Sequence, residues 1–282
     1  MAMDVLNIFN TLEQAALQDV EEKKKKKKEQ EFNFDKLQMY FGKDYKIKDM
    51  SGKEITIKMP KIGHILKFGE SRYFQALSPF CMNSTSIRVA LWDMTPRVDW
   101  TKVKDIEVFF RLSPALQDKE VIQTVFPDFD FSDIKLSELV DDPEHKPVLY
   151  SPSQQIILPE TSFMEMAEYI RTILNRHPKV EKPKGKTVKE WIIQEDKRKR
   201  LNQMEEESDS DYLLSLVSSC INHPGFKYRL EELEDMGIYQ FMDSVRRIQK
   251  YEQSTAVLKG MYSGFVDGSK LDPETYNFMG DV

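Results

Sequence analysis

Hydrophobic positions recur along the chain at two spacings, and the change from one to the other predicts where strands and helices lie. From residue 45 to residue 60 apolar residues occupy alternate positions around Ser51 and Gly52, which predicts a β-hairpin that Pro60 ends. A second hairpin is predicted over residues 147–159. Helical spacing of three and four residues covers other apolar segments, among them residues 62–77, 103–112, 164–174 and 238–262. The predicted fold class is α+β, mainly helical.

Changes in composition divide the chain into four segments. A run rich in proline and lysine from His177 to Gly185 is the clearest boundary, and the acids of residues 205–211 predict a hinge. We expect an amphipathic helix with a Lys-rich solvated extension, an α+β domain that contains the hairpins, a charged helical connector and a helical C-terminal subdomain. These are residues 1–31, 32–178, 179–211 and 212–282, respectively.

Two amphipathic helices have apolar faces that suit binding to another protein. In the N-terminal segment this face contains Val5, Phe9 and Leu12. In the C-terminal subdomain, a long helix that begins near residue 230 or 236 continues the apolar pattern to residue 262. The predicted partner-binding residues of this second helix are Phe241, Val245, Ile248, Leu258 and Tyr262. Either face could instead fill the core of this chain, and the sequence leaves both alternatives open.

Two other features of the C-terminal subdomain can be interpreted from their pattern. Residues 212–221, YLLSLVSSCI, are apolar nearly all round, which predicts a buried helix. Arg246 and Arg247 lie on the side of the long helix opposite its apolar face, where cations are ordinarily solvated. An alternative joins them to the basic residues of 182–200 as a surface that contacts phosphate.

Composition and charge restrict the class of protein. The chain has 282 residues, 40% of them hydrophobic, and a formal net charge of −6, so a folded protein with a real core is expected and the overall charge argues against a dedicated nucleic-acid binder. The run Lys23–Lys28 does not change this interpretation, because residues 1–31 contain seven acids against six lysines.

The sequence also bears on the cellular compartment. Acidic residues interrupt the N-terminal segment, which argues against a secretory signal. No apolar run approaches the roughly 18 residues of a membrane span, so no membrane partner is expected. Two cysteines far apart in sequence suit a reducing compartment. We therefore expect the protein in the cytoplasm at synthesis.

Each motif that resembles a catalytic or metal site fails a test of spacing. Gly185-Lys186-Thr187 lacks the first glycine of a phosphate-binding loop, because residue 180 is valine. The serine between Gly260 and Gly264 is not midway between them, as a nucleophile elbow requires. The four histidines are more than thirty residues apart and form no metal-binding pair. We therefore expect no catalytic residue, no cofactor and no metal, and hence a protein that is not an enzyme.

Three stretches resemble proteins of tailed bacteriophages that infect Gram-positive bacteria. They are GKEITIKMPKIGHILKFGE, which contains the first hairpin, INHPGFKYRLEELEDMGIYQFMDSVRRIQ, and LKGMYSGFVDGSKLDPETYNFMGDV at the end of the chain. The organisation is most similar to that of tail assembly chaperones encoded in virion-assembly modules. The Lys-rich N-terminal extension departs from that pattern.

This resemblance implies a non-enzymatic role in virion assembly. A tail assembly chaperone binds the helical tape-measure protein and tail-tube proteins in the host cytoplasm, and the 14 methionines and the amphipathic helices suit such binding. Two alternatives stay open: a structural component of the neck, tail or baseplate, which would be found in the virion, and a nucleic-acid-binding packaging accessory. A homo-oligomer is a further expected partner class.

Overall fold

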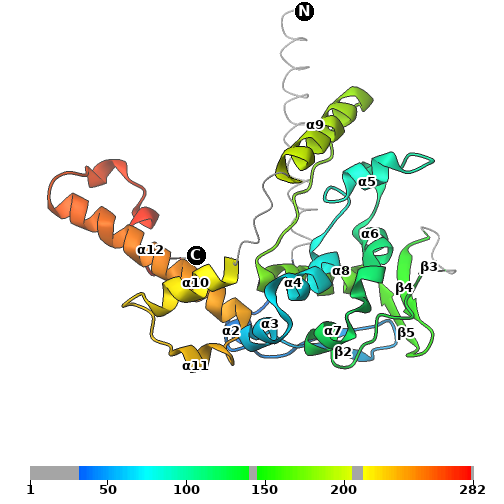
Figure 1. Cartoon of the computed structure of the whole chain (residues 1–282), viewed down its shortest axis with the longest axis horizontal. Coiled ribbons are helices and arrows are strands. Elements are labelled where there is room, and N and C mark those ends of the chain that lie inside the picture. The colour runs from blue at the N-terminus through cyan, green and yellow to red at the C-terminus, as the bar shows by residue number, and fades with distance from the viewer. Residues whose placement is uncertain (1–31, 140–144, 205–211, 281–282) are drawn as a thin grey trace, which may run out of the picture. The chain divides into compact units, whose positions relative to one another are not determined.

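The computed structural model describes residues 32–139, 145–204 and 212–280 (Figure 1). The chain divides into two compact units, residues 1–35 and 36–282, and all that follows concerns the second. The predicted N-terminal face of Val5, Phe9 and Leu12 lies outside the described residues. The α+β, mainly helical fold class predicted from the sequence is confirmed.

The second unit contains two small sheets among many helices (Figure 1). The strands are β1 (Tyr45–Lys48), β2 (Glu54–Ile57), β3 (Lys135–Glu138), β4 (Pro147–Ser151) and β5 (Ile156–Pro159). The α-helices are α2 (Lys36–Tyr40), α3 (Ile62–Phe68), α4 (Glu70–Cys81), α5 (Arg88–Asp93), α6 (Asp105–Leu112), α7 (Lys119–Val125), α8 (Glu160–Leu174), α9 (Lys186–Met204), α10 (Tyr212–Ile221), α11 (Leu230–Leu233) and α12 (Ile238–Tyr262). Short 3-10 helices are η1 (Trp100–Lys102), η2 (Ser113–Gln117), η3 (Gly268–Lys270) and η4 (Pro273–Thr275).

Both predicted hairpins are confirmed. β1 pairs antiparallel with β2, so that Ile47 lies opposite Ile55, and both side chains are buried on the same face. β4 pairs with β5 in the second hairpin, and β3 adds an edge strand that completes the order β3-β4-β5. The sequence pattern did not predict β3.

The helix α8 is central to this unit because it contacts α4, α6 and strands of both sheets. Aromatic rings fill the space around it: Phe109 lies between Phe80 and Phe163, with ring centroids 4.8 and 4.9 Å apart. Arg171 of α8 is buried and donates to the carbonyl oxygens of Phe80 and Met82 at the end of α4. Its guanidinium also pairs with a carboxylate of α6 at 2.9 Å, so the buried charge is compensated.

The connector helix α9 packs more tightly than its sequence predicts. Its Ile193 is 2% exposed and belongs to a cluster with Trp92 and Trp100. Arg88 of α5 donates to Asp196 of α9 at 2.8 Å. The charges of α9 therefore pair with neighbouring elements rather than with solvent alone.

A short backbone pairing joins the segment after β2 to the segment before α12. Three hydrogen bonds make this junction: Ile62 N–H donates to Met236 O (3.0 Å), Gly63 N–H to Glu234 O (2.9 Å) and Ile238 N–H to Pro60 O (2.8 Å). We call residues 60–63 and 234–238 the junction. A Cβ added at Gly63 would lie 2.8 Å from Glu234 O, so only glycine permits this approach.

The burial predicted for residues 212–221 is wrong. In α10 only Leu213 and Cys220 are buried, whereas Tyr212 and Leu214 are 54% and 61% exposed. The helix begins against α4, where a carboxylate oxygen of Glu70 accepts from Leu213 N–H at 2.9 Å and satisfies an N-terminal amide. None of the described helices combines the length and the apolar character that crossing a bilayer requires.

Substitution of Gly63 by alanine tests the junction. The added methyl group meets a backbone oxygen that cannot rotate away, so we expect a loss of about 1–3 kcal/mol in the free energy of unfolding. Urea denaturation measures it. Gly225→Ala is the matched control, because its Cβ meets the ring of His223, a side chain that can move. Equal stability of Gly63→Ala and the wild type would contradict the account of the junction.

His64, next to the junction, predicts a pH dependence of stability. Burial lowers the pKa of His64, and the charges of Lys61 and Lys67 lower it further. The unfolded chain, with its histidine pKa near 6.5, then binds the proton more readily than the folded chain. The contribution of His64 to the free energy of unfolding is therefore fully present above a pH of about 6.5 and is lost as the pH falls below that value.

The variant His64→Gln checks this assignment. We expect it to flatten the dependence of the unfolding free energy on pH below about 6.5, as measured by denaturation at a series of pH values. His145→Gln serves as the control, because the ring of His145 is largely exposed. An unchanged slope in His64→Gln would show that other groups cause the pH dependence.

Candidate protein-interaction surface

The apolar face of α12 divides into a buried half and a more exposed half. Phe241 and Val245, both predicted to bind a partner, are 0% and 8% exposed, and this half of the helix contacts α2 and α8. Ile248 and Leu258 are half-buried. Tyr262, the last residue of the helix, is 87% exposed. The structure therefore brings the five predicted residues onto one helix and leaves Tyr262 the most accessible of them.

The end of α12 is a Schellman turn. Gly264 has φ +76°, in the left-handed region that favours glycine, and its N–H donates to Met261 O at 3.1 Å. Phe265 N–H donates to Gly260 O at 2.9 Å and completes the turn. The chain direction after Tyr262 is thus fixed by backbone hydrogen bonds.

This turn leaves two aromatic rings in solvent. The apolar residue that follows the left-handed glycine frequently packs back on the helix. Here Phe265 is 90% exposed, because the residue at the facing helical position is Gly260, which has no side chain to receive it. We call Tyr262 and Phe265 the aromatic tip. Large apolar side chains on a fixed turn are typical of binding surfaces rather than of a core.

The glycines that resemble a catalytic elbow have a structural role. A Cβ at Gly260 would lie 2.6 Å from a methyl carbon of Val266, whereas one at Gly268 would meet only the flexible end of the Met261 side chain. Gly264 supplies the left-handed turn between them. The spacing of four residues therefore lets the chain turn sharply and return along α12.

The C-terminal segment packs back on α12. Arg247 donates to Gly280 O at 2.7 Å, and the rings of Tyr251 and Phe278 meet edge to face with centroids 5.8 Å apart. Asp272 caps the last 3-10 helix, because its carboxylate accepts from Glu274 N–H at 3.0 Å and starts η4. The returning segment thus covers the middle of α12 and leaves the aromatic tip exposed.

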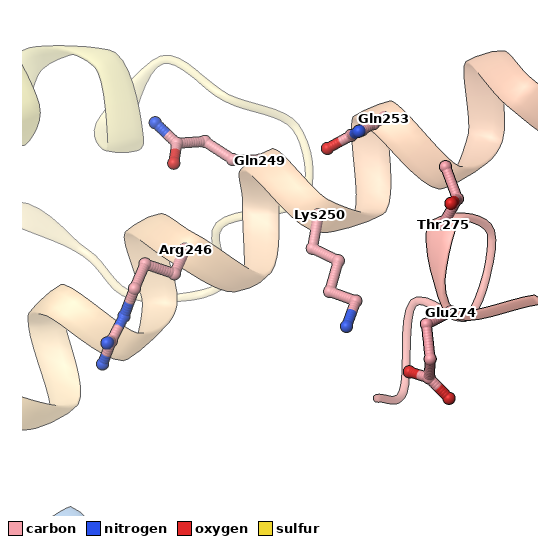
Figure 2. Close-up of a pocket in the computed structure, with 6 residues that line it drawn as sticks. All are labelled: Arg246, Gln249, Lys250, Gln253, Glu274 and Thr275. Atoms are coloured by element: carbon pink, nitrogen blue, oxygen red, sulfur yellow. The ribbon is translucent and has the colours of Figure 1, made fainter. Parts of the chain in front are cut away.

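A shallow pocket of about 320 Å³ lies between α12 and η4 (Figure 2). Its lining is polar and contains both signs of charge: Arg246, Gln249, Lys250, Gln253, Glu274 and Thr275. Figure 2 shows the Arg246 guanidinium directed away from Glu274. The arrangement offers hydrogen-bond donors and acceptors to a ligand but contains no nucleophilic side chain paired with a base.

The two cysteines are weak nucleophiles at neutral pH. Burial raises the pKa of Cys81 to about 11 and also raises the pKa of Cys220, so both thiols stay protonated. Among residues 32–139, 145–204 and 212–280, no three His, Cys, Asp or Glu side chains are grouped so that they could hold a metal ion.

Comparison with known proteins bears on the region that contains this surface. Residues 205–280 match the family model of the YomV second domain. This is a phage-associated family, with YomV from a Bacillus prophage. The match includes α10, α11, α12 and the aromatic tip, and it confirms the expected phage association; the tail chaperone assignment stays a prediction. No curated protein and no solved structure matches the chain.

Phe265 was missed by sequence reasoning, which followed only helical spacing. The signal that could have found it is the order Tyr262-Ser263-Gly264-Phe265, in which a glycine after a helix ends the helical pattern and redirects the next apolar residue.

Two phenylalanine substitutions test the division of this surface. We expect Phe241→Ala to lower the free energy of unfolding by about 3–5 kcal/mol, because it leaves a cavity in the core. Phe265→Ala deletes a phenyl ring that lies in solvent, so it should change the free energy of unfolding by less than about 0.5 kcal/mol. Thermal or urea denaturation compares the two variants. A large loss in Phe265→Ala would place that ring in the core.

Proposed function

We propose that this protein is a non-enzymatic virion-assembly protein that acts through protein contacts in the host cytoplasm. Its role is that of a tail assembly chaperone, which binds the helical tape-measure protein and tail-tube subunits. The phage-associated match of residues 205–280 supports the viral setting, and the resemblance of the C-terminal sequence to tail assembly chaperones supports the finer role.

The aromatic tip is the observation that carries this proposal. Aromatic side chains dominate the binding energy of protein interfaces when a partner buries them. The Schellman turn fixes Tyr262 and Phe265 before binding, so less conformational entropy is lost when a partner docks.

A helical partner fits the surface next to the tip. Thr255, Leu258 and Tyr262 follow one another at intervals of three and four residues; the first two are half-buried and Tyr262 is 87% exposed. Such a row forms a ridge that can pack into the groove of another helix. The tape-measure protein of the proposed role is a long helical protein and supplies such a groove.

The charges of α9 favour protein contacts over the nucleic-acid alternative. Lys189 pairs with Asp99 at 2.7 Å, and Lys197 pairs with Asp93 at 2.7 Å. These cations are therefore engaged within the chain rather than available to a phosphate backbone.

The double variant Tyr262→Ser/Phe265→Ser tests the proposal. We expect it to retain the wild-type unfolding transition and to lose at least about tenfold in affinity for the tape-measure protein, because the interface loses two aromatic anchors. Co-expression and co-purification followed by a binding titration measure the effect. Leu66→Ser is the control, since Leu66 is 61% exposed on α3. Undiminished capture by the double variant would refute the tip as the partner surface.

Two further outcomes separate the alternatives. Mass spectrometry of purified virions should not detect a chaperone, whereas stoichiometric copies would indicate a structural component of the virion. Sedimentation of the purified protein detects self-association, and a dimer that Tyr262→Ser/Phe265→Ser abolishes would identify a second copy as the occupant of the tip.

A further inference from the structure

A second hollow, distinct from the aromatic tip, lies between α2, the end of α8 and the first half of α12. Its volume is about 600 Å³, within the range of ligand-binding pockets. Three cations and one acid line it: Lys36, Arg246, Arg247 and Asp243. Excess positive charge in a concave site attracts anions.

Arg246 and Arg247 differ in whether their side chains have a partner within the chain. Arg247 lies 3.7 Å from Asp243 and donates to Gly280 O, so its charge is engaged within the chain. The side chains of Arg246 and Lys36 make no hydrogen bond and no ion pair with any residue in the described part of the chain. Two cations of the pocket therefore lack a counter-charge.

Arg246 is also partly withdrawn from water. Its Nε atom is buried and has no hydrogen-bond partner among the described residues, a state that costs free energy for a charged donor. Figure 2 shows its guanidinium directed away from Glu274, the acid of the neighbouring polar pocket. Arg246 also lines the second hollow, so an anion there would offset the charge of this guanidinium.

Neutral donors accompany these cations. Tyr239 and Asn175 line the same pocket. The side-chain amide of Asn175 and the hydroxyl of Tyr239 make no hydrogen bond to the described residues.

We propose that this pocket binds a phosphate-type oxyanion through Arg246 and Lys36, with Asn175 and Tyr239 as neutral donors. The guanidinium group matches the geometry of phosphate oxygens, and such charge-assisted hydrogen bonds are the strong ones. This site is independent of the proposed partner contact, because none of its residues belongs to the aromatic tip. The oxyanion is either a free phosphate compound or the backbone phosphate of a nucleic acid.

Nuclear magnetic resonance of the full-length protein tests the site directly. The Arg246 side-chain Nε–H signal is identified by its absence in Arg246→Lys. We expect inorganic phosphate, added at constant ionic strength, to shift this signal and the Asn175 side-chain amide signals saturably, whereas chloride does not. Lys36→Gln and Arg246→Gln should weaken phosphate binding by about tenfold, because each removes one charged donor.

The control variant is Arg200→Gln, which removes an exposed arginine from α9. It should bind phosphate as the wild type does, and all variants should keep the wild-type unfolding transition. Absence of a saturable shift in the wild type, or equal phosphate binding in Arg246→Gln, would overturn the proposal.

A second arm identifies the source of the oxyanion. Fluorescence anisotropy at low salt measures binding of a short single-stranded DNA. Binding that Arg246→Gln abolishes supports the site and assigns it to a nucleic-acid phosphate. Saturable binding of inorganic phosphate without binding of DNA supports the site and assigns it to a small phosphate compound.

Discussion

The backbone pairing of residues 60–63 with residues 234–238 is the constraint on which the C-terminal region depends. It consists of three hydrogen bonds between segments far apart in sequence, and it requires glycine at position 63, where a Cβ would lie 2.8 Å from the backbone oxygen of Glu234. The junction lies directly before α12, so it fixes the point from which that helix departs. The direction of α12 in turn determines where the aromatic tip is presented.

The two halves of α12 show how one helix serves both stability and binding. Burial of Phe241 and Val245 removes apolar surface from water and contributes roughly 1.5–3 kcal/mol for each side chain. Tyr262 and Phe265 make no such contribution to stability, because their side chains stay in solvent although the chain turns back beside them. Two aromatic rings exposed on a hydrogen-bonded turn, in a region that matches a phage-associated family, are consistent with a surface that a partner completes.

Local patterns in the sequence predicted the elements whose formation depends on neighbouring residues. Both hairpins and the long C-terminal helix follow from spacing. Features that depend on distant partners were not predictable. The strand β3, with the sequence KLSE, is mostly exposed and has no apolar alternation, so only its pairing with β4 makes it a strand. The exposure of Leu214 and the packing of Ile193 depend on tertiary neighbours in the same way. Of the two residues of the aromatic tip, helical spacing predicted Tyr262 but not Phe265, which lies beyond the end of the helix.

Site-specific photocrosslinking in cells that express the phage genome tests the central claim most directly. A photoreactive amino acid is placed at position 265, at the aromatic tip, and separately at position 230, where Leu230 is exposed at the start of α11. The account predicts a crosslink from position 265 to a phage assembly protein and none from position 230. No crosslink at position 265, or the same product at both positions, would contradict it.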